Sequence, residues 1–110
     1  MKIRIKNRVI EAEVADNLFK RMMGLSFSRR KNMFFPMEFE SRWSLWMFAV
    51  KYPLKMIFID KKKRVVDIKN GMPITSDPET WKTYTPSEPC KYILETPFVL
   101  DVKVGDMLSW

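Results

Sequence analysis

Three charged side chains, far apart in the sequence, are candidates for one polar site: Arg21, Asp60 and Glu95. A guanidinium can hold a carboxylate through two parallel hydrogen bonds, so this set is suited to bind a ligand or to pair within the protein. We favour the second role, an ion pair that holds a helix against a sheet. Asp60 also suits the first position of a hairpin turn, where its side chain accepts backbone N–H groups.

A second candidate site is apolar and centres on Trp46 and Met47. Flexible thioether side chains and flat aromatic faces both suit a ligand pocket. The simpler interpretation, which we favour, is that these residues fill the core. The methionines that would surround them are Met22, Met23, Met33, Met37 and Met56.

Two features of the composition limit catalysis. The chain has no histidine, which removes Ser-His-Asp and Cys-His chemistry, imidazole metal ligands and the usual general base near neutral pH. Its one cysteine, Cys90, can form neither an intrachain disulfide nor a thiolate cluster, and no histidine is present to activate it. We therefore expect no metal and no cofactor, and we recognise no catalytic motif. Carboxylates, lysines and tyrosines remain, so whether the chain is an enzyme stays open.

The basic charge suggests a third kind of site, for nucleic acid. The net charge is +7 at pH 7, which favours phosphate binding, and Trp43, Tyr52 and Trp81 offer faces for stacking. Solvated strand faces and charged hairpin tips, which block edge-to-edge aggregation, explain the same charge more economically. The basic candidates are Lys2, Arg4, Lys6, Arg29, Arg30, Lys61, Lys62 and Lys63.

The elements that must position these residues begin with a hairpin and a helix. At 110 residues the chain has the usual size of one domain, spanning 1–110. Isoleucine alternates with basic residues over 2–5, which predicts a strand paired with 10–14. Asp16 can cap a short helix near residues 16–24, which glycine would end.

The rest of the chain indicates strands and turns. Pro36 places its segment at a sheet edge or a bulge, whereas 45–50 is apolar throughout and predicts a central strand covered on both faces. Two apolar runs flank 61–63, which predicts a hairpin with a charged tip. Residues 71–90 hold four of the seven prolines and predict a long ordered loop, and alternation over 98–104 predicts a further strand.

Many short strands separated by turns are typical of β sandwiches and barrels. The sequence therefore predicts a mainly β fold. We expect a single-domain antiparallel β sandwich or barrel-like fold with one short helix near residues 16–24.

The composition indicates a thermophilic source and a cytoplasmic location. The chain has no glutamine and four asparagines, while 30% of its residues are charged, a bias of proteins that work at high temperature. No uncharged stretch approaches the roughly 20 apolar residues of a membrane span, and the N-terminal segment has no apolar signal region.

Six motifs occur in an order and spacing that resemble a known family. They are Ala15 to Leu25, Met33-Phe34-Phe35, Trp46-Met47 with Pro53-Leu54, Ile57 to Asp60, Tyr92 to Glu95, and Val104-Gly105-Asp106. The chain is similar to the uncharacterised domain of unknown function 192 family over nearly its whole length. The resemblance implies a compact β sandwich or barrel-like fold with a small helical element. It implies no activity, because the family has no established function.

Departures from the family pattern affect the Trp46 region. After the Trp-Met pair the family typically has a Lys-Asn-Thr-like run, and this chain has Phe48, Ala49 and Val50. After Pro-Leu the family typically has aspartate, and this chain has Lys55. If that polar cluster is the family's working site, this chain has lost or moved it. The retained polar candidates are Arg21, Asp60, Glu95 and Asp106, the last of which we assign to a turn.

These observations lead to three functional hypotheses. The leading one is a non-catalytic β module that binds a small molecule or a protein partner through Arg21, Trp46, Met47, Asp60 and Glu95. The alternative is a weak, sequence-independent nucleic-acid binder that uses the basic candidates. A weaker alternative is a hydrolase or lyase with Glu95 or Asp60 as its acid or base, which requires a carboxyl group of raised pKa in a cleft.

Overall fold

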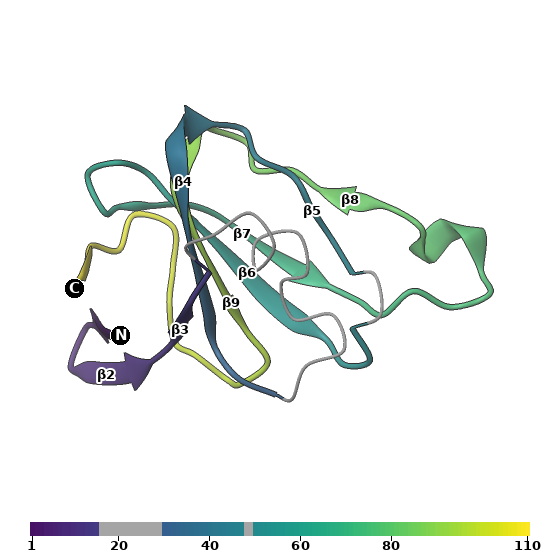
Figure 1. The fold of residues 1–110 in the computed structure, drawn as a ribbon, viewed down its shortest axis with the longest axis horizontal. Coiled ribbons are helices and arrows are strands. Elements are labelled where there is room, and N and C mark those ends of the chain that lie inside the picture. The colour runs from purple at the N-terminus through teal and green to yellow at the C-terminus, as the bar shows by residue number, and fades with distance from the viewer. Residues whose placement is uncertain (16–29, 48–49) are drawn as a thin grey trace.

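The chain is mainly β, as its sequence predicts. The computed structural model describes residues 1–15, 30–47 and 50–110, and the predicted helix near residues 16–24 lies outside them. The described residues form ten strands and one turn of 3₁₀ helix (Figure 1). These are β1 Lys2–Ile5, β2 Arg8–Glu11, β3 Glu13–Val14, β4 Met33–Ser41, β5 Leu45–Trp46, β6 Leu54–Ile59, β7 Val65–Gly71, η1 Pro78–Thr80, β8 Thr83–Tyr84, β9 Cys90–Thr96 and β10 Leu108–Ser109.

The strands form three sheets. The largest has the order β3-β4-β9-β6-β7, the second β10-β1-β2, and the third pairs β5 with β8. All pairs are antiparallel except β3 with β4, which run parallel where Glu13 faces Met33. The predicted antiparallel architecture is therefore correct apart from this short mixed edge.

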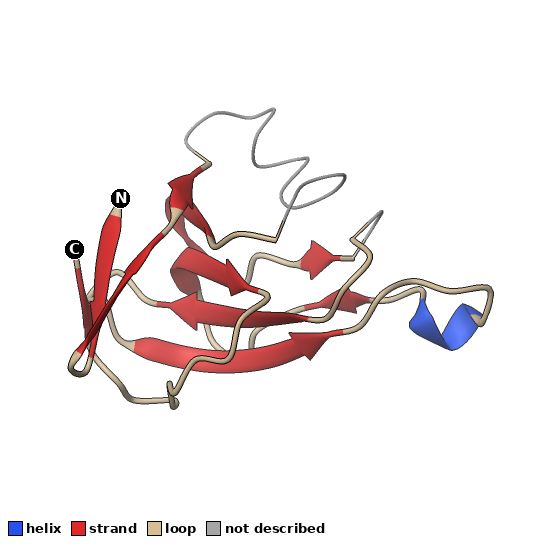
Figure 2. Ribbon diagram, turned by 90° about the horizontal axis from the view of Figure 1, so that it is seen from below, coloured by secondary structure: helices blue, strands red, loops and turns tan. Residues whose placement is uncertain are grey.

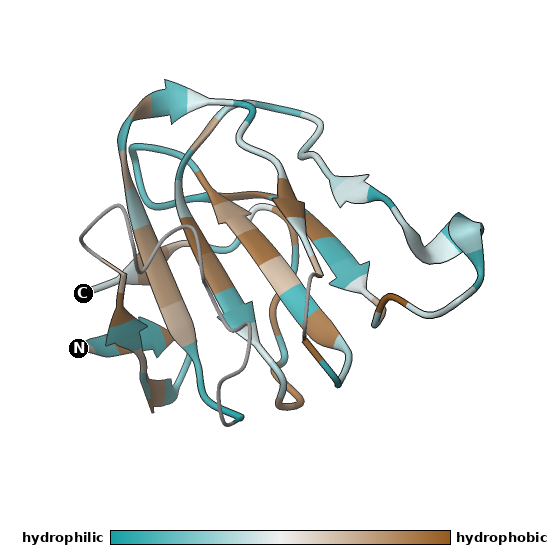
Figure 3. Cartoon of the chain, turned by 45° about the vertical axis from the view of Figure 1, so that its right-hand side comes forward, coloured by the Kyte–Doolittle hydropathy of each residue, from teal (hydrophilic) through white to brown (hydrophobic). Residues whose placement is uncertain are grey.

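Alternate residues of the largest sheet point to opposite faces, and both faces are covered. On one face Phe34, Ile57 and Leu94 pack against Ile3 and Ile5 of the second sheet. The opposite face carries Phe35, Phe58 and Ile93 and packs against Met47, Val50, Tyr52 and Tyr84. Figure 3 shows the resulting apolar bands on the middle strands. The molecule is a sandwich with a further layer on its second face.

β6 is covered on both faces, and the prediction of such a strand over 45–50 is wrong. In β6 Met56, Ile57, Phe58 and Ile59 are all fully buried. The 45–50 run instead contributes the two-residue strand β5, whose Trp46 is 54% exposed. An apolar run does not distinguish a sheet centre from an edge that covers another layer.

Other predicted elements are confirmed in part. β4 shifts register between Pro36 and Ser41, as expected for a proline at a bulge. The 71–90 segment is more than a loop, because it contains η1 and β8. Residues 98–104 form no strand, and the predicted inward face holds only in part: Leu100 and Val102 are buried, whereas Phe98 and Val104 are 49% and 58% exposed.

The two ends of the sandwich differ. Both chain termini lie at one end, whereas η1 and β8 extend at the opposite end (Figures 1 and 2). No helix in the described part of the chain is long and apolar enough to cross a membrane.

Candidate functional site

Asp60 is a turn residue at the tip of the β6–β7 hairpin. Its Oδ1 accepts the backbone N–H groups of Lys62 and Arg64, each at 2.9 Å, and its Oδ2 lies 3.9 Å from Arg64 Nε. These bonds support a backbone that reaches a positive φ of 69° at Lys63. Glu95 pairs in register with Met56 on β6. Met56 precedes Asp60 by four residues, which corresponds to roughly 13 Å at the rise of a strand. The structure thus places Asp60 away from Glu95, and Arg21 lies outside the described residues.

Asp60→Ala is expected to destabilise the protein by about 1–3 kcal/mol, because two backbone donors lose a charged acceptor. Urea unfolding, followed by circular dichroism, measures the change. Asp101→Ala is the matched control, since that side chain is 80% exposed and forms a surface ion pair with the Lys6 ammonium at 3.3 Å. A loss at Asp60 no larger than at Asp101 would show that the turn does not depend on the carboxylate.

Glu95 is the most unusual polar group of the described residues. It is 4% exposed in the middle of the largest sheet, and its cross-strand neighbours are Met33 on β4 and Met56 on β6. Its Oε1 has no hydrogen-bond partner in the part of the chain that the structure describes. Burial raises the pKa of this carboxyl to about 8, because the charged form loses its hydration. At neutral pH the carboxyl is therefore mainly protonated.

Tyr52 lies close enough to Glu95 and to Arg30 for both charges to act on its pKa. The pKa of Tyr52 is raised, first by burial and second by the charge of Glu95, while the Arg30 charge acts in the opposite direction. The Arg30 guanidinium carbon lies 5.0 Å from the centre of the Tyr52 ring, a cation–π contact. The spacing of these three residues in the sequence carries no signal of this proximity. Arg30 and Tyr52 were considered separately as nucleic-acid candidates, and the structure stacks one on the other.

Trp46 and Met47 are adjacent in sequence but point to different environments. Met47 is fully buried, in the same core layer as Met56, whereas Trp46 is half exposed. A Cβ on Gly71 would lie only 2.8 Å from Met47 Sδ and 2.8 Å from the Met56 methyl carbon. Both thioethers therefore pack directly against the β7 backbone, and a side chain at position 71 would require these two flexible methionine ends to shift. Met47 thus fills the core, as the simpler interpretation holds, and Trp46 does not.

Trp46 lines a hollow of about 710 Å³ on the extended end of the molecule. The hollow lies over the β5–β8 ribbon, where Trp46 pairs in register with Thr83. The walls formed by the described residues are mostly apolar, with one ammonium group among them. The lining residues are Trp46, Ile74, Trp81, Lys82 and Thr83.

Trp81 is held firmly although it is 61% exposed. Its indole Nε1 donates to the Thr75 carbonyl at 2.7 Å, and its backbone N donates to the Pro78 carbonyl at 3.0 Å. The Thr80 hydroxyl accepts the Thr75 N–H at 2.9 Å and donates to the Asp77 carbonyl at 2.7 Å. The sequence indicates for Trp81 only a stacking face. Its fixed position in a wall of the hollow follows from loop bonds that no residue pattern revealed.

The basic candidates are spread over the surface, and several already have partners. The Lys6 ammonium lies 3.3 Å from the Asp101 carboxylate and 3.7 Å from that of Asp106. Its charge is therefore partly compensated within the protein. Lys63 stacks over Trp110 with 4.6 Å between its Nζ and the ring centre. Lys2, Arg4, Lys61 and Lys62 stay exposed, and Arg29 lies outside the described residues.

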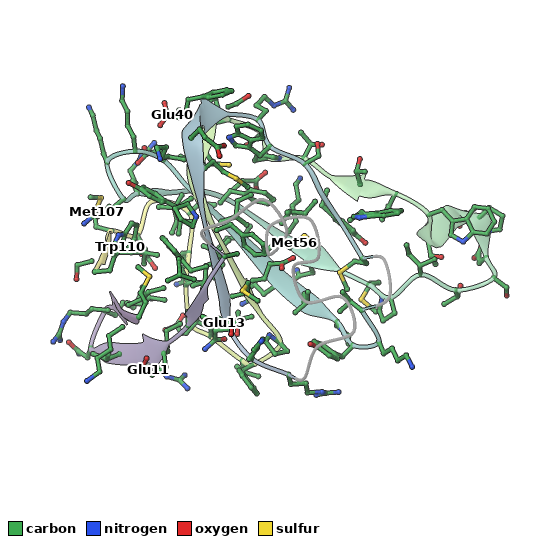
Figure 4. The ribbon with its side chains drawn as sticks, in the orientation of Figure 1. Glu11, Glu13, Glu40, Met56, Met107 and Trp110 are labelled. Atoms are coloured by element: carbon green, nitrogen blue, oxygen red, sulfur yellow. The ribbon has the colours of Figure 1, made fainter. Side chains whose placement is uncertain are left out.

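The basic residues of β1 and those of the β6–β7 tip are connected through β10. Arg4 on β1 pairs with Ser109 on β10, and the Leu108 N–H donates to the Lys63 carbonyl at 2.9 Å. The strand β10 thus joins the outer face of β1 to the β6–β7 tip. In Figure 4 the labelled Trp110 and Met107 lie at one end of the molecule, far from η1. The basic surface and the Trp46–Trp81 hollow therefore lie at opposite ends.

Cys90 is a free, buried cysteine. Burial raises the pKa of the Cys90 thiol to about 11, so the nucleophilic thiolate is scarce at neutral pH. Asp106 accepts the Lys103 N–H at 2.9 Å beside Gly105, whose φ is 98°, in keeping with its assignment to a turn. Within the ranges described, no three His, Cys, Asp or Glu side chains gather in a group that suits a metal ion.

Comparison with known proteins supports the resemblance seen in the sequence. The DUF192 family profile, described as "Uncharacterized ACR", matches residues 1–110. A UPF0127 protein of Thermococcus gammatolerans is 34% identical over 89% of this chain, and one of Pyrococcus furiosus is 33% identical over 92% of it. The prediction of thermophilic character agrees with these relatives, which come from thermophilic archaea.

The relatives differ from this chain in length. It spans 65% and 64% of the T. gammatolerans and Thermococcus sibiricus proteins, and 87% of the P. furiosus protein.

Two solved structures share the fold. One is a protein of unknown function from Novosphingobium aromaticivorans, with a TM-score of 0.83, 21% identity, and coverage of 99% of this chain and 84% of the other. The second, described as a putative transcription regulator from Sinorhizobium meliloti, has a TM-score of 0.81, 23% identity, and coverage of 98% and 89%. The relatives and neighbours together indicate no specific function.

Proposed function

The chain belongs to the DUF192 family, and we propose that this member is a non-catalytic binding module that takes a small, flat, mainly apolar ligand between Trp46 and Trp81. The observation that carries the proposal is the hollow of about 710 Å³ on the β5–β8 ribbon. Ligand sites in proteins have volumes of about 300–1,000 Å³, mostly apolar walls and a few polar groups. This hollow fits that description.

The fixed position of Trp81 supports binding rather than core packing. An indole that is 61% exposed gains little by its own burial, yet a set of hydrogen bonds holds its loop in one conformation. A wall that is already ordered loses little conformational freedom when a ligand binds, which improves affinity. Large rigid aromatic side chains are also the usual anchors of binding surfaces.

The proposal predicts that planar heteroaromatic compounds stabilise the protein and that Trp81→Ala weakens their binding by about 30-fold. The loss corresponds to about 2 kcal/mol, the scale of an aromatic anchor. A ligand at 100 times its dissociation constant adds about 2.7 kcal/mol to the free energy of unfolding, which a thermal shift detects. Isothermal titration then gives the affinity of each variant.

Phe39→Ala is the matched control, because Phe39 is 60% exposed and lies on β4 outside the lining of the hollow. It is expected to keep the affinity of the unsubstituted chain. The proposal fails if no compound of a broad planar panel stabilises the protein, or if both variants bind equally well.

The nucleic-acid alternative gains no support from the arrangement of side chains. Single-strand binders combine a basic groove with stacking rings along one path. Here the exposed lysines and arginines belong to β1 and the β6–β7 tip, at the end opposite η1 and β8 (Figures 1 and 2). This alternative stays a prediction of the basic composition. Its signature is an oligonucleotide affinity that falls steeply with salt and is independent of Trp81.

The carboxylate-enzyme alternative is reduced to Glu95. Asp60 is occupied in turn bonds and an ion pair with Arg64, whereas Glu95 has the raised pKa that an acid catalyst needs. Glu95 is buried in the core, with 4% exposure, and the described residues around it leave no path for a substrate. We therefore place the function at the hollow.

A cytoplasmic location is also part of the proposal. The buried free thiol of Cys90 is compatible with a reducing compartment, where unpaired cysteines are common. Cell fractionation followed by immunoblotting tests it.

A further inference from the structure

Among the described residues that line the hollow, Lys82 is the one with a charged side chain, and it has no ion pair with any carboxylate in the same part of the chain. The nearest acids along the chain are Asp77 and Glu79. The Asp77 Oδ1 already accepts the Glu79 N–H at 3.0 Å, in the cap of η1. The hollow therefore has an uncompensated positive charge at its wall.

The position of this charge is set by Tyr84. The Lys82 Nζ lies 5.4 Å from the centre of the Tyr84 ring, a cation–π contact. Tyr84 is buried, with 7% exposure, and its hydroxyl accepts the Met72 N–H at 3.1 Å. Because burial and the hydrogen bond to Met72 fix the Tyr84 ring, the cation–π contact positions the Lys82 ammonium beside the apolar walls.

The hollow thus offers two kinds of contact to one ligand. Trp46, Trp81 and Ile74 present apolar surface, and Lys82 and the exposed Thr83 hydroxyl present polar groups at the same ribbon. Apolar walls lower the local dielectric constant, so an anion next to them interacts with Lys82 more strongly than it does in bulk water. A ligand gains from both contacts only if a flat ring and a negative charge are joined.

We propose that the ligand of the hollow is a planar aromatic carboxylate, whose ring packs on Trp46 and Trp81 and whose carboxylate pairs with Lys82. The inference rests on the proposed function, because it names the chemistry of the ligand at the same site. It excludes neutral and cationic aromatic compounds as preferred ligands.

The test compares three ligands that share one ring system: indole-3-acetate, indole-3-acetamide and tryptamine. Their side groups are an anion, a neutral group of the same shape, and a cation. Isothermal titration at low ionic strength measures their affinities for the unsubstituted chain, for Lys82→Met and for Lys61→Met. Methionine keeps most of the apolar stem of lysine without its charge, and Lys61 is exposed at the opposite end of the molecule.

The unsubstituted chain is expected to bind the acetate about fivefold more tightly than the amide, the scale of a partly exposed ion pair, and to bind tryptamine most weakly. In Lys82→Met the acetate and the amide should bind equally, with the affinity for the amide unchanged. Lys61→Met should keep the preference. Added salt should reduce the preference without abolishing binding of the amide.

The outcomes separate the two proposals. If the acetate and the amide bind equally to the unsubstituted chain, or if Lys82→Met keeps the preference, the inference about the anion is wrong and the binding hollow remains. If tryptamine binds best, the charge argument is also overturned. If none of the three binds, both the inference and the proposed function fail.

Discussion

Glu95→Gln is expected to make the protein more stable at alkaline pH and to leave its stability at pH 4 nearly unchanged. The pKa of Glu95 is about 8 in the folded protein, against an ordinary value of 4.5. Below pH 4.5 both states hold the proton, and the buried neutral carboxyl costs little. Between pH 4.5 and 8 the unfolded chain releases the proton and the folded chain does not, so the free energy of unfolding falls as the pH rises. Glutamine has a similar shape and no proton to release.

The size of the effect follows from the shift in pKa. A difference of several pKa units corresponds to on the order of 3–5 kcal/mol between pH 4 and pH 9. Urea unfolding of both chains across that range measures it, and the quantity of interest is the difference between the chains, because other groups titrate equally in both. Glu11→Gln, at a side chain 68% exposed, is the control. A difference that stays constant from pH 4 to pH 9 would show that Glu95 is not a buried neutral acid.

Phe58→Ala and Ile57→Ala are each expected to destabilise the protein strongly, by about 3–5 and 2–5 kcal/mol. The two residues are neighbours on β6, both are fully buried, and they point to opposite faces of the sheet. Each substitution removes apolar contacts and leaves a cavity in a different core layer. Chemical denaturation of the two variants measures the losses.

The pair of variants tests the architecture as well as the energy. Val99→Ala, at 91% exposure, is expected to change stability by less than about 0.5 kcal/mol. If only one of the two β6 substitutions is costly, β6 is covered on one face alone. The layered core described above would then be wrong.

The adjacent residues Trp46 and Met47 connect the core to the candidate site. Met47 packs against Met56 and Gly71, which anchors the start of the outer layer to the largest sheet. Trp46 lines the hollow from β5. Its position is fixed by its neighbour Met47, which packs in the core, and by the pairing of Trp46 with Thr83 on β8. A change at Met47 should therefore disturb ligand binding indirectly, through the position of Trp46.

Much of the fold could be predicted from the sequence because its signals are local. The alternation over 2–5 reappears as β1, with Ile3 and Ile5 buried and the basic residues outside. The hairpin around 61–63 forms with Asp60 in its turn, since turn residues and period-two patterns act over a few neighbours. The family could be identified for the same reason, because its motifs are short runs in a fixed order.

The candidate site could not be predicted, because it depends on which layers meet. Both β6 and the 45–50 run are apolar, and which of them is covered on both faces depends on the elements that pack against it. An apolar run by itself does not indicate those elements. Glu95 comes beside Tyr52, and Trp81 comes beside Trp46, only after strands distant in sequence have paired. The residue types alone thus determined a mainly β domain with basic outer faces. Tertiary structure alone decided that Trp46 and Trp81 are exposed, that the Glu95 carboxyl is buried, and that the Lys82 ammonium lies beside apolar walls.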